Sequence, residues 1–355
     1  MQAFGFLRFR PNLYVMRFLL FPLILLVACT APRTAVEADA LPETLRVAFY
    51  NVENLFDTVD DPLTLDEEFT PQGKKQYTEA RYAEKLDRLG EVIQRMDYPA
   101  IVGVSEVENR AVLEALTKTD RLRAVPYRIE HFDSPDVRGI DVGLLYRSDQ
   151  FEPTGAQALP INFPASIVED YTTRDVLIVS GKLAGEPVHV LVNHWPSRRG
   201  GLAASEPKRT YVAAQVRRAV DSISLVRPDA QFIIMGDFND EPDNRSVMST
   251  LGAQLTREGK MENVLFNTVA EQDKQGEGSY NYRGNWNMLD QIILSGNFLD
   301  DKGLQYLRSE VFQHESLLFD HPKNGLMPNR SYGGPNYYGG YSDHLPVFIE
   351  LRPGR

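Results

Sequence analysis

The sequence predicts a mixed α/β protein with enough strands for two β-sheets. Eight short apolar runs rich in β-branched residues alternate with two long segments whose apolar residues recur at helical spacing. Polar side chains follow several of these runs at the point where each strand is expected to end. No Pro/Gly/Ser-rich linker and no internal repeat divides the 355 residues, which favours one large domain.

The elements follow in chain order from these patterns. Short β-branched apolar runs are typical of buried strands, whereas apolar residues spaced three and four apart with plausible caps indicate amphipathic helices. We expect the helices at 79–96 and 205–226. The strands are expected at 45–51, 99–106, 141–147, 176–183, 187–193, 231–237, 289–295 and 345–351.

The N-terminus is typical of an export signal. Arg8, Arg10 and Arg17 precede an apolar run over 18–28 that is too short to span a bilayer. The run ends in Leu-Val-Ala-Cys29, which resembles a bacterial lipobox, and Cys29 is the only cysteine. The alternative is a structural cysteine that ends a simple signal peptide.

The lipoprotein interpretation gives the chain three parts. Residues 1–28 would be the signal peptide, 29–43 a flexible tether beginning at the lipidated Cys29, and 44–352 the folded domain. Thr30 carries no obvious inner-membrane retention signal, so we expect an exported protein anchored in the outer membrane of a Gram-negative cell. A lone cysteine excludes an intramolecular disulfide.

The charge balance limits the partners. Without residues 1–28 the chain has 35 basic and 49 acidic side chains, a net charge of −14. Such a surface opposes long polyanions, so nucleic-acid contact would have to be local. The densest basic region could make that contact or could be a solvated helix face: Arg198, Arg199, Lys208, Arg209, Arg217 and Arg218. Nothing indicates a protein partner, and we expect a monomer.

The polar residues at the strand ends predict a shared site. Acids at Glu53, Glu106, Asp237 and Asp343 would repel one another unless a cation sat among them. Mg²⁺ is the expected ion because it binds one or two carboxylates and keeps water and phosphate oxygens as further ligands, with Mn²⁺ or Ca²⁺ as alternatives. Zinc fits less well, because the chain has no HExxH pair and no cysteine after the lipobox.

The neutral and basic groups suit a phosphoryl oxygen. Amide and imidazole donors would come from Asn51, Asn239, His194 and His344, and Asp290 is placed to orient an imidazole. Taken singly, each could have an ordinary structural role. The asparagines could form turns, Glu106 could cap a helix starting near Asn109, and the histidines could be satisfied strand-end residues.

Seven motifs in order resemble the endonuclease/exonuclease/phosphatase superfamily, the DNase I-like fold, over about residues 44–352. They are FYNVEN, GVSEVEN, GIDVGLLY, VLVNHW, IIMGDFND, MLDQIIL and YSDHLPV. The resemblance implies a four-layer α/β sandwich of two facing mixed sheets flanked by helices. It also implies metal-dependent hydrolysis of a phosphate ester by in-line attack of water.

The resemblance assigns roles to the matching positions. Glu106 would be the principal metal ligand, with Asn51, Glu53 and Asp343 as further metal-site residues. Asp237 would position or activate the attacking water, and Asn239 would contact phosphate. His194 would stabilise the charge of the transition state, while His344, oriented by Asp290, would act as general base or as a donor.

The substrate is less determined than the chemistry. Arg138, Trp195, Arg198 and Tyr341 adjoin the motifs and are the candidate substrate-binding residues, although the tyrosines of 332–341 could equally pack down. We expect a nuclease of the bacterial secreted type. The alternatives are a phosphatase or phosphodiesterase acting on phospholipid headgroups or small phosphate esters, and a surface lipoprotein that binds phosphate without turnover.

Overall fold

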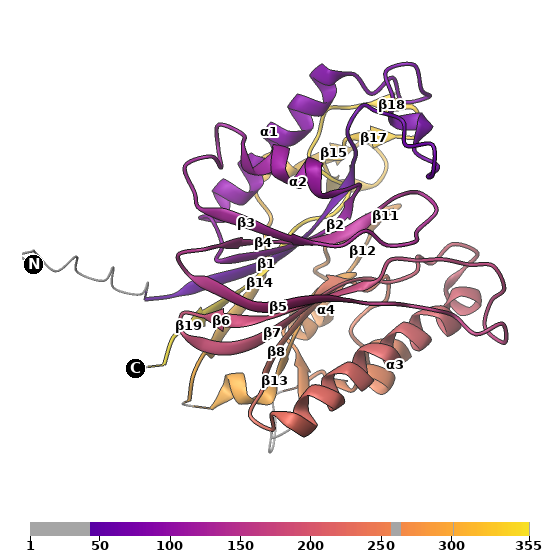
Figure 1. The fold of residues 1–355 in the computed structure, drawn as a ribbon. Helices are drawn as coiled ribbons and strands as arrows, with labels where there is room; N and C mark the ends of the chain where they lie inside the picture. Colours follow the sequence, from indigo (N-terminus) through magenta and orange to yellow (C-terminus); the bar gives the residue numbers. More distant parts are fainter. Residues whose placement is uncertain (1–42, 257–263, 301, 355) are drawn as a thin grey trace, which may run out of the picture. The chain divides into compact units, whose positions relative to one another are not determined.

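The strands of this computed structural model form two β-sheets packed face to face (Figure 1). The structure describes residues 43–256, 264–300 and 302–354, so the expected signal peptide, Cys29 and the tether up to 42 lie outside the described residues. Helices cover the outer faces: α1 and α2 lie over one sheet, and α3 lies over the other. This is the four-layer α/β sandwich that the sequence predicts.

Both sheets mix parallel and antiparallel pairs. The six-stranded sheet runs in the order β14 (Gln305–Val311), β19 (Val347–Arg352), β1 (Leu45–Leu55), β2 (Ile101–Val107), β4 (Asp141–Arg147), β3 (Tyr127–His131). The seven-stranded sheet runs in the order β5 (Phe151–Leu159), β6 (Val176–Leu183), β7 (Glu186–His194), β8 (Gln231–Asp237), β13 (Asp290–Ser295), β10 (Leu265–Asn267), β9 (Ala253–Gln254). The parallel pairs are β1 with β2, β7 with β8, and β9 with β10.

Three two-stranded ribbons complete the β structure: β11 (Tyr280–Tyr282) with β12 (Asn285–Asn287), β15 (Leu318–His321) with β16 (Gly325–Pro328), and β17 (Tyr332–Gly333) with β18 (Asn336–Tyr337). The α-helices are α1 (Glu79–Arg95), α2 (Arg110–Thr117), α3 (Leu202–Val226) and α4 (Ala270–Lys274). Single turns of 3₁₀ or π geometry lie at Glu67–Phe69, Ser246–Leu251, Gly296–Leu299 and Glu315–Leu317.

Local chemistry explains the helix boundaries. The Thr78 side chain accepts the Arg81 amide at the start of α1, a cap that contributes about 1 kcal/mol. Asn109 caps α2 in the same way by accepting the Val112 amide. Glu106 therefore does not cap this helix, and its carboxylate remains available for another role. Helix α3 begins at Leu202, three residues before the expected start.

The core lies between the two sheets and continues beneath α1. Fully buried Phe49, Val104, Ile233 and Ile292 belong to one apolar cluster drawn from both sheets. At Gly103 of β2, an added Cβ would lie 2.4 Å from the Met235 sulfur of β8. Large side chains on one sheet thus fill space left by small ones on the other.

The topology brings chemically active strand ends to one edge. Because β1 and β2 are parallel, and β7 and β8 are parallel, all four end on the same side of the sandwich. Strand β13 is antiparallel to β8, so it starts there, with Asp290 paired to Asp237. Strand β19 is antiparallel to β1 and also starts at this edge.

Among the residues that the structure describes, no helix has the length and apolar character that crossing a bilayer requires.

Candidate active site

Six strand ends supply one cluster of polar side chains. Because the strands extend from a packed core, their terminal residues are held by rigid backbone rather than by mobile loops. Strands β1, β2, β7 and β8 contribute from their carboxyl ends, whereas β13 and β19 contribute at or just before their starts. The side chains gathered there are Asn51, Glu53, Glu106, His194, Asp237, Asn239, Asp290, Asp343 and His344.

Asp237 lies at the centre of this cluster. Its Oδ2 accepts the Asn51 side-chain amide at 3.1 Å, and its Oδ1 accepts the Asn239 backbone N–H at 2.9 Å. The side chain is buried, and burial raises the pKa of Asp237 from 3.8 to about 7, with the charge of Asp290 acting in the same direction and His344 opposing it. A carboxyl group with this pKa can exchange a proton near neutral pH.

His344 and Asp290 form a buried pair. The Nδ1 of His344 lies 2.6 Å from Asp290 Oδ2, and Asp290 is fully buried. Burial lowers the pKa of His344, but the charge and hydrogen bond of Asp290 outweigh it and raise the pKa well above 6.5. His344 is therefore an imidazolium whose Nε2, 4.0 Å from Asp237 Oδ2, is a charged donor.

His194 has the opposite protonation state. Its Nε2 lies 3.6 Å from Asp237 Oδ2 and 4.0 Å from Glu106 Oε1. Burial lowers the pKa of His194 well below 6.5, and the charges of Arg174 and Arg138 lower it further. The site thus contains one cationic and one neutral imidazole on either side of the same carboxylate, a difference set by surroundings rather than by residue type.

Four residues at the rim adopt left-handed backbone conformations. Glu53, Asn54, Glu106 and Asn239 have φ between 49° and 62°. Asparagine tolerates this region, but each glutamate carries a backbone strain of about 1 to 3 kcal/mol that the surrounding packing must offset.

Glu106 is the acid that best fits a divalent cation. Its Oε2 accepts the Asn54 backbone N–H at 3.1 Å, while Oε1 faces His194 at 4.0 Å without a hydrogen bond. The side chain is partly exposed, so it can share an ion with water and with a substrate oxygen, which is the coordination that Mg²⁺ prefers.

Two of the expected ligands, Glu53 and Asp343, have protein partners in this structure. The oxygens of buried Glu53 accept the backbone N–H groups of Ser331 and Tyr332 at 2.7 and 3.3 Å. Asp343 is paired with Arg330 at 2.7 Å, and Arg330 also lies 3.5 Å from Glu53. Both oxygens of Glu53 therefore accept backbone donors, whereas the contacts of Asp343 with Arg330 use only its Oδ2. Asn51, the fourth expected ligand, directs its amide to Asp237 and its Oδ1 to the Glu53 N–H.

A second set of donors also has metal-ligand spacing. One ligand atom from each of Asp237, Asp290 and His344 lies within 4.8 Å of the others. However, the oxygens and nitrogen of this set already contact one another or protein donors, since Asp290 Oδ2 lies 2.6 Å from His344 Nδ1 and Asp237 accepts from Asn51 and Asn239. The ion is better placed at Glu106.

Sequence reasoning missed Lys85, a buried cation behind the rim. Its ammonium donates to Ser331 Oγ at 2.7 Å and to the Tyr341 carbonyl at 2.6 Å, and so ties α1 to the segment that surrounds Glu53. Burial lowers the pKa of Lys85 to about 8, although Glu53 and Asp343 oppose this shift. A lysine in an amphipathic helix gives no local signal that it will be buried.

The sequence also did not predict that Arg174 and Arg209 would be buried and would hold the loops of the site. Buried Arg174 donates to the carbonyls of His194 and Trp195 at 3.2 and 2.7 Å, and pairs with Asp136 at 3.0 Å. Arg209, placed by the sequence on a solvated or nucleic-acid-binding face, is fully buried and pairs with Asp240 at 2.7 Å. Both guanidinium groups hold the loops that carry the site and cannot contact substrate.

Two of the four expected substrate contacts are wrong. Trp195 has no exposed surface and packs edge-on against Phe238 with ring centroids 4.6 Å apart. Tyr341 is buried, and its hydroxyl donates to Glu91 of α1 at 3.1 Å. Side chains packed in the interior do not stack on a substrate.

The other two expected contacts are arginines. Arg198 is partly buried and donates to the Asn239 carbonyl at 2.8 Å, so it supports the loop after β8. Arg138 is exposed, lies 3.5 Å from Asp136 and contributes to the field at His194. Of the four, Arg138 is the side chain free to reach a phosphate.

One hollow among the described residues lies away from this cluster. It has a volume of about 1250 Å³ and is lined by the C-terminal end of α3 and the starting residues of β7 and β8, such as Pro187 and Phe232. These strands begin at the opposite edge from Asp237 and His194. We place the chemistry at the strand ends because donors, acceptors and shifted pKa values converge there.

Comparisons with known proteins agree with this fold. The Endonuclease/Exonuclease/phosphatase family profile matches residues 46–353. No curated protein sequence gives a significant match. Similar solved structures include humanized TDP2 of D. rerio, 16% identical with a TM-score of 0.53 and covering 88% of this chain and 100% of that one.

Two further structures come from other organisms. The mannosyl-6-phosphatase of Bacteroides thetaiotaomicron is 17% identical, has a TM-score of 0.53 and covers 86% of this chain and 99% of its own. The human Nocturnin catalytic domain, solved with bound sulfate, is 16% identical, has a TM-score of 0.52 and covers 88% and 96%. At these identities the likeness shows the fold, while the profile match spans almost the whole described domain. The chain therefore belongs to the endonuclease/exonuclease/phosphatase family, whose members hydrolyse phosphate esters and typically use divalent metals.

Proposed function

We propose that this protein is a Mg²⁺-dependent phosphodiesterase that cleaves nucleic acid by in-line attack of water. One observation carries the proposal. Asp237 Oδ2 faces the neutral imidazole of His194 at 3.6 Å, the imidazolium of His344 at 4.0 Å and the Asn51 amide at 3.1 Å. Asp237 is a proton acceptor with a pKa near 7, and His344 is a charged hydrogen-bond donor close to it. This pair suits the attack of water on a phosphorus atom.

Each group has a task in that reaction. Asp237 accepts the proton of the attacking water, because its pKa of about 7 allows it to be ionised and still basic. His344 donates from Nε2 to a phosphoryl oxygen, and Asp290 keeps its ring oriented and protonated. Asn51 and Asn239 hold Asp237 in position by donating to it. A divalent cation held at Glu106 would supply neutralisation of the charge on the phosphoryl oxygens.

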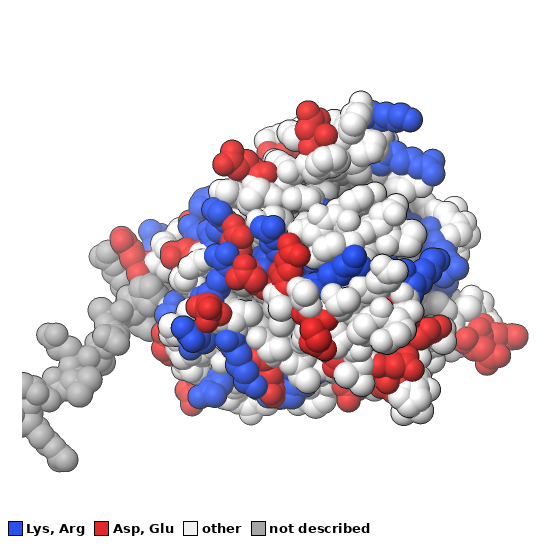
Figure 2. All heavy atoms as spheres, turned by 90° about the horizontal axis from the view of Figure 1, so that it is seen from above, with Lys and Arg blue, Asp and Glu red and all other residues white. Residues whose placement is uncertain are grey.

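The acidic surface favours a second candidate, a phosphoesterase acting on lipid headgroups or small phosphate esters. Figure 2 shows basic and acidic side chains interspersed on the face drawn, without a continuous basic stripe among the described residues there. Arg209, one member of the basic region expected to bind polyanions, is buried. A small substrate needs less positive surface than a long nucleic acid.

A substrate panel tests these candidates. Purified protein with Mg²⁺, Mn²⁺ or Ca²⁺ is incubated with plasmid DNA, RNA, phosphoinositides, sphingomyelin and nucleotides, and with Glu106→Gln as the matched control. Cleavage of DNA or RNA that weakens steeply with added salt supports a nuclease, whereas salt-insensitive cleavage of a lipid or nucleotide supports the second candidate. Phosphate binding without turnover of any substrate would refute both and leave a binding lipoprotein.

We also propose that the protein is exported and lipid-anchored through Cys29, which would become the first residue of the mature chain. The support is the charged and apolar N-terminal segment followed by a single cysteine. Cells producing the wild-type chain should incorporate labelled palmitate into it and retain it in the outer-membrane fraction. Cys29→Ala should abolish both, and an unchanged distribution would disprove the anchor.

A further inference from the structure

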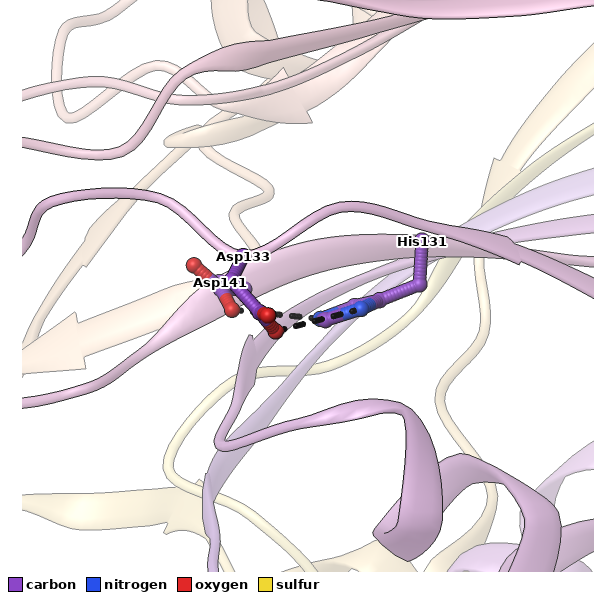
Figure 3. A group of neighbouring side chains, drawn as sticks. All are labelled: His131, Asp133 and Asp141. Carbon is purple, nitrogen blue, oxygen red and sulfur yellow. Dashed lines mark ion pairs between the residues drawn. The ribbon is translucent and has the colours of Figure 1, made fainter. Parts of the chain in front are cut away.

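A second group of potential ligands lies outside the catalytic cluster. His131 ends β3, Asp133 follows it in the next loop, and Asp141 begins β4, the neighbouring strand. Figure 3 shows the two carboxylates lying together beside the imidazole of His131. One ligand atom from each residue lies within 4.8 Å of the others. The mechanism above uses none of the three side chains.

The histidine supplies a second, independent observation. The His131 side chain is only 2% exposed, and its Nε2 lies 3.1 Å from Asp141 Oδ2 without meeting the geometry of a hydrogen bond. This buried nitrogen therefore faces a carboxylate oxygen without a well-aligned hydrogen-bond partner, and an ion bound by both atoms would satisfy them.

Asp141 is oriented as a metal ligand would be. Its Oδ1 accepts the Ser134 backbone N–H at 2.9 Å and also the Ser134 hydroxyl, while Oδ2 faces the imidazole. Hydrogen bonds of this kind fix a carboxylate so that the remaining oxygen points at an ion. Asp133 faces the other ring nitrogen at 3.8 Å, and its side chain is 89% exposed and free to rotate.

We propose that His131, Asp133 and Asp141 form a second divalent-metal site, selective for borderline ions such as Zn²⁺ over Mg²⁺. An imidazole with two carboxylates suits Zn²⁺, whereas Mg²⁺ prefers oxygen ligands alone. Ligand atoms that share an ion at about 2 Å lie roughly 3 to 4 Å apart. The 3.1 Å separation of the His131 nitrogen and the Asp141 oxygen already meets this requirement.

The ion would close the loop over 132–140, because its ligands lie at both ends of that loop. Within the loop, Asp136 pairs with Arg174, which in turn donates to the carbonyls of His194 and Trp195. Occupancy would therefore restrain the loop that supports His194. The site is structural, and its ligands need not contact substrate.

Calorimetric titration of the metal-free full chain with Zn²⁺ tests the proposal without any activity measurement. Wild type should bind one more equivalent than His131→Gln, and Asp133→Asn should bind that equivalent at least tenfold more weakly. Glu106→Gln should retain the site, and His321→Gln, a control on a distant ribbon, should match wild type. At a hundredfold excess over Kd, Zn²⁺ should raise the Tm of wild type by about 3 °C more than it raises the Tm of His131→Gln.

Two results would overturn the proposal. One is wild-type stoichiometry and affinity in both His131→Gln and Asp133→Asn. The other is loss of all Zn²⁺ binding in Glu106→Gln, which would assign the ion to the catalytic cluster. Because Asp133 is exposed, its variant folds independently of the buried histidine and decides the question if His131→Gln does not fold.

Discussion

Replacing Asp237 with Asn should stabilise the protein while it abolishes turnover. The folded-state pKa of about 7 exceeds the ordinary 3.8, so the folded protein holds an extra proton between these values. Stability contributed by this group is complete below pH 4 and is lost as pH rises toward 7. At pH 8 the shift of about 3 units corresponds to about 4 kcal/mol of lost stability.

The asparagine of Asp237→Asn avoids most of this loss of stability, because its side-chain amide does not ionise. An asparagine side chain at this position would keep the hydrogen bond from the Asn239 backbone but would lose the one from the Asn51 side chain, at a cost of about 1 kcal/mol. We therefore expect Asp237→Asn to be about 3 kcal/mol more stable than wild type at pH 8 and about 1 kcal/mol less stable at pH 4. Urea unfolding of the metal-free proteins at several pH values measures this difference.

The control is Asp120→Asn, since that side chain is 87% exposed and should show no pH-dependent gain. A difference between Asp237→Asn and wild type that stays constant from pH 4 to pH 8 would refute the reasoning. It would mean that burial does not disfavour the ionised form of Asp237. The proposed role of this side chain as a proton acceptor near pH 7 would then lack a physical basis.

Three further changes test other parts of the structure. Asp290→Asn should lower the pKa of His344, because it removes the charge that outweighs burial. NMR titration of the ring measures this pKa, and an unchanged value would contradict the prediction. The pKa of Lys85 is about 8 in the folded protein against 10.5 for a free lysine. The free energy of unfolding of wild type should therefore rise relative to that of Lys85→Met by up to about 3 kcal/mol between pH 8 and 10.5. A stability difference between the two proteins that does not change with pH would exclude this. Gly236→Ala should lower the free energy of unfolding by about 2 to 3 kcal/mol, because the new Cβ would lie 2.4 Å from a backbone oxygen of β7. Gly155→Ala should lower it far less, because a Cβ there would have no atom within 4 Å. Equal losses of stability in urea unfolding would count against the clash.

The strands that the sequence predicted are those buried on both faces. Runs such as 231–237 have no exposed residue, and their apolar pattern is unmistakable. The strands that it did not predict are mostly edge strands: β3, β5 and β14 each have a largely exposed face and mixed composition. Edge strands are defined by pairing with a neighbour, which no local pattern records.

For the candidate site, the sequence indicated which residues lie at the strand ends but not where each side chain points. Asn51, Glu106, His194, Asp237 and His344 could be named because polar residues rarely end several buried strands in one chain without a shared role, and the motif order supported them. The direction of a side chain after the strand end was not predictable. Trp195 follows His194 directly, yet the chain turns it into the core while His194 faces the cluster.

The sequence by itself determined the α/β class and the strand ends whose polar side chains meet in one cluster, and it led us to expect a divalent cation and a phosphate ester there. These follow from periodicity and residue type, which act over a few neighbouring positions. Only the tertiary structure decided that His344 is charged and His194 neutral, and that Glu53 is held by Ser331 rather than free for a metal. Protonation and ligand availability depend on burial and on charges brought within a few ångströms by folding, and those neighbours lie up to hundreds of residues away along the chain.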